Sequence, residues 1–387
     1  MFQIVDKQVF LDYPLGHHLH CMISQIGNDL HLNQPQNNDL SCANKWALIE
    51  SVMQLVASGE GNLKKLHFLL FPEATLPAQY LDRALKIIEE KFCVNTVTMF
   101  GVEHIKLHQF KEVVQRYAAD NQELLQSVLT DMDSADIANL RVNWAVVAIK
   151  QGDGKLRIFL QAKSHPFVGE ESMDTSDLYH GKVFPMFHSQ PTGFNFMAMI
   201  CFDYIYRTIY HSNISTVINH ANELFFSTRQ RLDFLAILEC NPKPEHDTFR
   251  DVINGFYGEY LAAAPGVRET ITVFCNSSGQ TRDYIPHALA EDTFGRSAVI
   301  IHKKHKMSND NLNEFNIDDF SGLPIRRLRF GCDNRLYYFN LPIFYEFDPR
   351  STRMPLKVHS IFEPTAQGGW QHVNYRLTPA QPPRSAS

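Results

Sequence analysis

The sequence lacks the cysteine spacing of a disulfide-rich or zinc-binding protein. Its seven cysteines stand singly, with no C-x-x-C pair, and their number is odd. This pattern excludes a disulfide framework and a structural zinc site of the usual spacing. One of these residues can therefore matter as a thiol: Cys21, Cys42, Cys93, Cys201, Cys240, Cys275 and Cys332.

Long hydrophobic runs and a strong charge excess are also missing. No apolar stretch approaches the roughly 20 residues that a membrane-spanning helix needs, and the N-terminus has no basic start followed by an apolar stretch and a cleavage site. The net charge of -6 over 387 residues gives no general attraction to nucleic acid or to an anionic membrane. These absences predict a cytoplasmic globular protein with no membrane part, and they argue against a nucleic-acid partner.

Two local basic runs and one histidine cluster have simple structural explanations. The runs HKKHK (302–306) and IRRLR (325–329) lack the interleaved aromatic residues of a single-strand platform, so they indicate solvated faces or contacts with a partner. The histidines of residues 16–20 have no carboxylate or cysteine at ligand spacing nearby, so we predict a polar turn there and no metal site.

Apolar runs and helical patterns alternate along most of the chain, which is typical of an α/β domain. With 44% hydrophobic residues, the chain can form one large core or two modest ones. No internal repeat is present. The pattern predicts strands at 21–27, 66–73, 95–104, 194–200, 232–241, 269–279 and 296–306, a hairpin at 143–163, helices at 44–62, 78–92 and 248–264, a helical insertion at 107–138 and a loop at 164–193.

Three polar residues each follow an apolar strand. Glu73 follows FLLFP, Lys163 follows LRIFLQA and Cys201 follows FNFMAMI. Taken singly, each has a structural explanation: a solvated or capping acid, a surface charge and an inert core thiol. Strand ends are where α/β proteins build their sites, so the occurrence of all three at such ends indicates a shared site.

An acid, a cation and a thiol form a coherent set for acyl transfer. A carboxylate can take the proton of the thiol and return it to a leaving group, and an ammonium can stabilise the negative charge on an attacked carbonyl. Cys201 is also predicted at a strand-to-helix turn, where the following amides favour a thiolate. Cys240 and Cys275 close strands too, but neither precedes a turn with an acid immediately after it, so Cys201 is the preferred nucleophile.

These motifs resemble those of the nitrilase superfamily, the carbon-nitrogen hydrolases. The matching segments, in the family's order, are CMISQIG, LLFPEATLP, QAKSHPFVGEE, MAMICFD, VFCNSSGQ and FGRSAVI, within residues 20–305. The resemblance implies a four-layer α-β-β-α sandwich that acts without a cofactor or a metal. It implies that Glu73 is the general base, that Cys201 is the nucleophile that forms a thioester, and that Lys163 and the amide of Phe202 stabilise the tetrahedral intermediate.

The resemblance also implies a second acid and a substrate class. Either Glu170 or Glu171 fills the position of the family's second glutamate. The motif CFD after Ile200 leans towards amide hydrolysis, so a small-molecule amide or nitrile is the expected substrate. The basic residue that often follows this motif is absent, which argues against recognition of a substrate carboxylate by that route.

We predict four segments along the chain. Residues 1–20 form an N-terminal extension, 21–305 the catalytic domain, 306–375 a C-terminal arm and 376–387 a disordered Pro/Ser-rich tail.

The arm contains the aromatic run LYYFNLPIFYEF, which either packs on a second subunit of a homo-oligomer or adds a hairpin to the chain's own core. A second functional hypothesis is that the nitrilase fold serves as a binding or assembly module beside another protein, such as a defence-system reverse transcriptase.

Overall fold

The computed structural model describes most of the 387-residue chain. The described residues are 2–13, 19–30, 39–165, 178–208, 211–228, 230–244, 247–260, 264–267, 269–283, 294–303, 305, 316–319, 322–342 and 356–373. The predicted disordered tail, 376–387, lies outside them.

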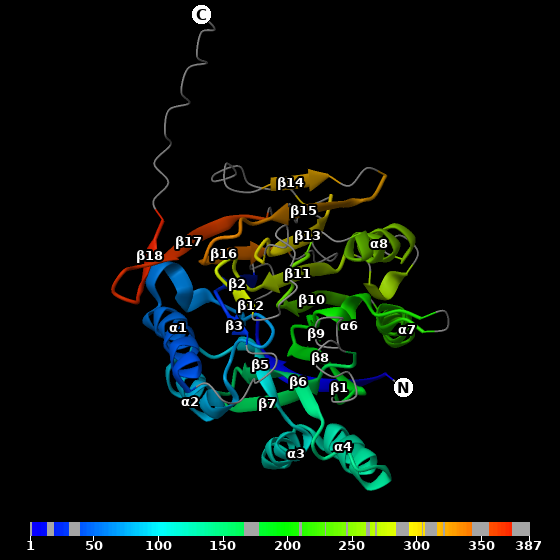
Figure 1. Ribbon diagram of the computed structural model, residues 1–387. Helices are drawn as coiled ribbons and strands as arrows, with labels where there is room; N and C mark the ends of the chain where they lie inside the picture. Colours follow the sequence, from blue (N-terminus) through cyan, green and yellow to red (C-terminus); the bar gives the residue numbers. More distant parts are fainter. Residues whose placement is uncertain are drawn as a thin grey trace, which may run out of the picture.

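Two sheets of eight strands lie at the centre of this part (Figure 1). Sheet A has the order β1 (Gln3–Leu11), β8 (Val183–Pro191), β9 (Asn195–Ile200), β10 (Leu232–Glu239), β11 (Ile271–Asn276), β13 (Ala298–His302), β15 (Ile325–Arg329) and β14 (Asn316–Asp319). Sheet B has the order β18 (Trp370–His372), β17 (Val358–Pro364), β16 (Arg335–Leu341), β2 (Leu19–Gln25), β4 (Phe68–Leu70), β5 (Thr96–Lys106), β6 (Arg141–Lys150) and β7 (Leu156–Ala162). The strands β3 (Asp29–Leu30) and β12 (Arg282–Asp283) pair separately.

Parallel pairing brings several strand ends to one edge of each sheet. In sheet B, β2, β4 and β5 run parallel, and β7 has the same direction because β6 is antiparallel to both β5 and β7. In sheet A, β9, β10 and β11 run parallel. The residues that follow β4, β7, β9 and β10 can therefore meet, since loops at the carboxyl ends of parallel strands converge.

The inner faces of the two sheets pack on each other. Phe68 of sheet B has its ring centroid 5.3 Å from that of Phe196 and 4.9 Å from that of Phe234, both in sheet A. All three side chains are fully buried. Burial of one such ring stabilises the fold by about 1.5–3 kcal/mol, so this interlayer core holds the strand ends at fixed positions.

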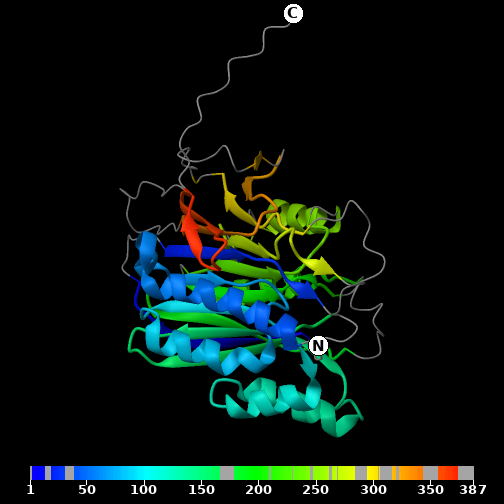
Figure 2. The ribbon, with the colours of Figure 1, turned by 60° about the vertical axis from the view of Figure 1, so that its left-hand side comes forward.

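Helices cover the outer face of each sheet (Figures 1 and 2). On sheet B, helices α1 and α2 pack over β2, β4 and β5, and α3 and α4 pack beside β5 and β6. On sheet A, α6, α7 and α8 contribute to the apolar cluster that contains the strands. The helices are α1 (Asp39–Ser58), α2 (Leu81–Lys91), α3 (Leu107–Arg116), α4 (Gln122–Ser134), α6 (Phe202–Ile205), α7 (Asn213–Phe225) and α8 (Asp247–Gly255).

The α/β prediction is confirmed, together with the predicted hairpin at 143–163 and the helical insertion at 107–138. The predicted loop at 164–193 is partly wrong, because residues 183–191 form β8 between β1 and β9. Residues 3–11, within the predicted N-terminal extension, form β1 at an edge of sheet A.

The aromatic run of the predicted C-terminal arm belongs in part to this core. Strand β16 pairs with β2 and with β17, and Tyr337, Tyr338 and Phe339 are buried within the chain. The second interpretation, a hairpin that completes the chain's own core, therefore holds for residues 336–341. Residues 343–347 of the run lie outside the described residues.

Candidate active site

Glu73 lies where the chain leaves β4 and continues beside the neighbouring strand β5. The apolar residues of β4 are buried on both faces, and the chain stays hydrogen-bonded to β5 through the amides of Thr75 and Leu76, which donate to the carbonyl of Gly101. Glu73 is 4% exposed. Its backbone is thus fixed by a buried strand on one side and by main-chain hydrogen bonds on the other.

Gly101 permits this close approach. A Cβ atom at that position would lie within 3.0 Å of the Cα of Glu73, the carbonyl oxygen of Pro72 and the amide nitrogen of Ala74. All three are backbone atoms, so no side-chain rotation could relieve the clash. The sequence FPEA therefore needs a glycine on β5 opposite it.

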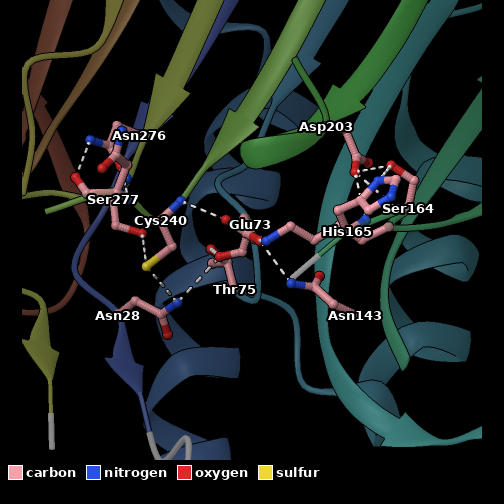
Figure 3. A network of polar contacts seen from close by, with 12 residues as sticks. Asn28, Glu73, Thr75, Asn143, Ser164, His165, Asp203, Cys240, Asn276 and Ser277 are labelled. Carbon is pink, nitrogen blue, oxygen red and sulfur yellow. Dashed lines mark hydrogen bonds and ion pairs between the residues drawn. The ribbon is translucent and has the colours of Figure 1, made fainter. Parts of the chain in front are cut away.

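Asn28 supports the turn from the other side. Its Nδ2 donates to the carbonyl oxygens of Ala74 at 3.0 Å and of Glu73 at 3.4 Å. Ala74 has φ 52°, a left-handed conformation that costs a non-glycine residue roughly 1 kcal/mol or more. The Glu73 side chain beyond this turn reaches Lys163, which follows β7, and the amide of Cys240, which follows β10 (Figure 3).

Among the described residues, three groups donate hydrogen bonds to the Glu73 carboxylate. Lys163 Nζ lies 2.7 Å from Oε1, Asn143 Nδ2 also lies 2.7 Å from Oε1, and the amide of Cys240 lies 3.1 Å from Oε2 (Figure 3). The Glu73 and Lys163 side chains are 6% and 3% exposed. Removal of one partner from such a buried pair typically costs about 3–5 kcal/mol, because the other charge stays buried and uncompensated.

Lys163 follows β7 and is fixed on both sides of its backbone. Its amide donates to the carbonyl of Asn143 at 2.8 Å, and its own carbonyl accepts from the amide of Gly181 at 2.8 Å. A Cβ atom at Gly181 would lie within 3.0 Å of the backbone of Ala162, so this contact also depends on a glycine. Each charged member of the site is thus backed by a glycine from a neighbouring segment.

Cys201 follows β9 in an unusual backbone conformation. It has φ 42° and ψ -104°, which is sterically disfavoured for a residue with a Cβ atom, and it is 5% exposed. Its amide donates to the carbonyl of Leu238 at 2.9 Å, and the single-turn helix α6 starts at Phe202. The Cys201 amide is therefore occupied, and the amide of Phe202 is the next one along the chain.

Asp203 ties the Cys201 turn to the Lys163 segment. Its Oδ1 accepts from the Ser164 amide at 2.8 Å, from the Ser164 hydroxyl at 2.7 Å and from the His165 amide at 3.3 Å (Figure 3). The neighbours of Lys163 and of Cys201 are therefore in direct contact, which brings the three predicted residues to one end of the interlayer core.

Burial dominates the electrostatics of Asp203. It raises the pKa of this carboxyl group to about 7, although the hydrogen bonds from Ser164 and the charge of Lys163 act in the opposite direction. Burial also lowers the pKa of the neighbouring His165 to about 4, with a contribution from the charge of His180. At neutral pH the ring of His165 is uncharged, so Lys163 supplies the positive charge on this side of the site.

The two alternative nucleophiles are held as thiols. Burial raises the pKa of Cys240 to about 12, and its Sγ accepts a hydrogen bond from the Ser277 hydroxyl at 3.2 Å. Burial also raises the pKa of Cys275 far above its ordinary value, and its Sγ lies 3.4 Å from the carbonyl oxygen of Leu70. Neither environment favours a thiolate, and none of the seven cysteines forms a disulfide.

The structure describes four of the predicted site residues and shows one further residue in contact with them. Glu73 and Lys163 are in direct contact, and Cys201 and Phe202 lie at the adjacent strand end. Glu170 and Glu171, the candidates for the second acid, lie outside the described residues, as do His17 and His18 of the histidine cluster. Sequence reasoning missed Asn143, whose signal was a lone amide inside the apolar run RVNWAVV.

No protein-family model matches the chain, and no curated protein matches it. Within the described ranges, no group of three or more His, Cys, Asp or Glu side chains could hold a metal ion. None of the described helices is both long enough and apolar enough to cross a membrane.

Proposed function

We propose that this protein is a carbon-nitrogen hydrolase of the nitrilase type that acts through a cysteine thioester. The observation that carries the proposal is the buried pair of Glu73 and Lys163, 2.7 Å apart, beside a cysteine in a strained turn at the next strand end. A buried carboxylate–ammonium pair and a thiol at converging strand ends indicate nucleophilic catalysis more than structural support.

The arrangement of layers supports the finer assignment of the fold. Helices α1 and α2 cover sheet B, the two sheets pack face to face, and α7 and α8 cover sheet A. We assign this order to the four-layer α-β-β-α sandwich of nitrilase-type hydrolases. In that assignment the strand ends that carry Glu73, Lys163 and Cys201 form one catalytic edge.

The proposed reaction starts with transfer of the Cys201 thiol proton to the Glu73 carboxylate. The sulfur attacks the carbonyl carbon of an amide, and the oxygen that becomes negative is stabilised by the Lys163 ammonium and the amide of Phe202. Glu73 then gives its proton to the leaving nitrogen as the C–N bond breaks. A water molecule, deprotonated by Glu73, hydrolyses the thioester, and the proton returns to Cys201.

A small-molecule amide is the preferred substrate class, with a nitrile as the alternative. In the nitrile reaction the attacked atom is the nitrile carbon and the charge develops on nitrogen, but the roles of the three residues are the same. We assign the second acid of this mechanism to Glu170 or Glu171. No cofactor takes part in the proposed chemistry.

The experiment is a screen for ammonia release with a panel of small amides and nitriles. Wild-type protein is compared with Cys201→Ala and Glu73→Gln, and Cys93→Ala serves as the control because Cys93 is an exposed cysteine. Release that is lost in the first two variants and kept in the control supports the proposal. A folded wild-type protein that is inactive on the whole panel, with a Cys201 no more reactive than Cys93, would refute it and favour a binding or assembly module.

Two further parts of the proposal concern the setting of the protein. All seven cysteines lack a disulfide, which favours a reducing compartment, so we propose a cytoplasmic location. We also propose a homo-oligomer, which light scattering of the purified protein tests: a mass equal to one chain would refute it.

A further inference from the structure

The two oxygens of the Glu73 carboxylate have different surroundings. Oε1 accepts from Lys163 Nζ and from Asn143 Nδ2, each at 2.7 Å. Oε2 accepts a single hydrogen bond among the described residues, from the amide of Cys240 at the longer distance of 3.1 Å. A carboxylate oxygen accepts about two hydrogen bonds in its plane, so Oε1 is saturated and Oε2 keeps an open acceptor position.

The two donors to Oε1 come from adjacent positions on neighbouring strands. Trp144 pairs with Ala162 in the β6–β7 ladder, and the next step along both strands brings Asn143 opposite Lys163. The amide of Lys163 donates to the carbonyl of Asn143, so their backbones are locked in register. Asn143 is 3% exposed. A rigid hairpin thus presents an amide and an ammonium to the same oxygen.

Oε2 is hydrogen-bonded on the side of sheet A, which also carries the Cys201 turn. Its donor, the Cys240 amide, follows β10, and the amide of Cys201 is hydrogen-bonded to Leu238 of the same strand. The open acceptor position of Glu73 is therefore next to the strand end that holds the Cys201 turn, and the saturated oxygen is next to the β6–β7 hairpin.

We propose that Asn143 is a positioning residue that, with Lys163, holds Oε1 of Glu73 and leaves Oε2 as the oxygen that exchanges the proton with Cys201. This inference rests on the proposed function, since it assigns a task within the same site. Without the Asn143 donor, the carboxylate can rotate and share the Lys163 ammonium between both oxygens, which competes with proton transfer. Asn143 acts through Glu73 and not on the substrate.

The test measures the rate at which iodoacetamide alkylates Cys201 from pH 4 to pH 10, followed by peptide mass mapping. Asn143→Leu removes the donor and keeps the side-chain volume close to that of asparagine, and Asn143→Ala is the second variant. In both variants we expect slower alkylation of Cys201 at neutral pH. The acid limb of the curve of alkylation rate against pH should move upward by about one pH unit, the size expected from the loss of one charge-assisted hydrogen bond.

Gln161→Ala is the matched control. Gln161 lies two residues before Lys163 on β7, is 1% exposed and has no hydrogen-bond partner for its side-chain amide among the described residues. It faces Ala145, two residues along β6 from Asn143. We expect its alkylation profile to match that of the wild-type protein, because it does not contact Glu73.

The outcomes separate this inference from the proposed function. A wild-type Cys201 that is no more reactive than the exposed Cys93 refutes the function, and this is seen without any variant. A reactive wild-type Cys201 with an unchanged profile in folded Asn143→Leu or Asn143→Ala overturns the role of Asn143. A loss of stability in urea without a change in the pH profile also overturns it, because that is the result of a purely structural role.

Discussion

Replacement of Gly101 by alanine tests how the fold positions the catalytic base. In an ordinary strand position this change would be neutral or would stabilise by about 0.5–1 kcal/mol, because alanine has less conformational freedom to lose. At Gly101 the added Cβ atom would meet the Cα of Glu73 and two neighbouring backbone atoms within 3.0 Å. The segment that carries Glu73 must therefore move away from β5.

The cost of this movement can be gauged from the contacts involved. Overpacking in a closely packed region typically costs about 1–3 kcal/mol. The displacement also strains the hydrogen bonds from Thr75 and Leu76 to the Gly101 carbonyl. A misplacement of a catalytic group by about 1 Å can reduce a rate by roughly 10²-fold. We therefore expect a moderate loss of stability and a much larger loss of Cys201 reactivity.

The assay combines urea denaturation with alkylation of Cys201 by iodoacetamide at neutral pH. Gly255→Ala is the matched control, because a Cβ atom there would meet nothing within 4 Å. That variant should keep wild-type stability or gain slightly, and it should keep wild-type alkylation. Wild-type stability and wild-type alkylation in Gly101→Ala would refute the argument that Glu73 depends on this close approach.

Three further predictions concern buried or paired charges. In Lys163→Met the Glu73 carboxylate stays buried without its cation, so urea denaturation should show a free energy of unfolding lower by about 3–5 kcal/mol, and an unchanged value would contradict the ion pair. Burial raises the pKa of Asp203 from 3.8 to about 7, so wild-type stability should fall as the pH rises through that interval, and Asp203→Asn should lack this slope. If the stability of Asp203→Asn depended on pH in the same way as that of the wild type, this would contradict the raised pKa of Asp203. Burial alone would raise the pKa of Asp6, but hydrogen bonds from two histidines, one of them His220, hold this pKa well below 3.8. The same hydrogen bond raises the pKa of His220 above 6.5. The pair of Asp6 and His220 therefore stabilises the fold at pH values between these two pKa values. This contribution is lost as the pH falls through the lowered pKa of Asp6 or rises through the raised pKa of His220. Asp6→Asn should remove both effects from thermal unfolding measured between pH 3 and pH 9, and loss of neither would refute the pairing.

Local pattern was enough to predict the elements with a strong apolar period. The strand before Glu73, the β6–β7 hairpin and the helices α1 and α2 all bury a continuous apolar face, so hydrophobic periodicity finds them. The strands β1 and β8 were missed for a physical reason. The segment QIVDKQVFL carries three consecutive polar residues at its centre, and VFPMFHSQP contains Pro185 and Pro191, which weaken a strand signal.

Long-range pairing also lies beyond local pattern. In the structure Val5 pairs with Pro185, so β1 finds its partner about 180 residues along the chain. No window of the sequence contains both strands. The pairing of β1 with β8 can be identified only in the complete sheet A, in which β8 also pairs with β9.

The charged residues of the site were predictable, but their supports were not. Glu73 and Lys163 stand at the ends of apolar runs, which marks them in the sequence. Asn143, Asn28 and Gly101 act through contacts between segments that are distant in the sequence. Of the three, Asn143 has a local signal, a lone amide in an apolar strand, but that signal does not show which residue it contacts. The residues that position a site depend on the packing of the whole fold, so local sequence does not predict them. The charged residues of the site can be predicted, because each follows an apolar strand.

Intact mass spectrometry after incubation with the amide and nitrile panel detects the proposed covalent intermediate itself. We expect an added mass equal to the acyl group, or to the thioimidate for a nitrile, which peptide mapping assigns to Cys201. The adduct should be absent in Cys201→Ala and much reduced in Glu73→Gln. An adduct on Cys240 in place of Cys201, or a folded protein that forms no adduct with any member of the panel, would contradict it.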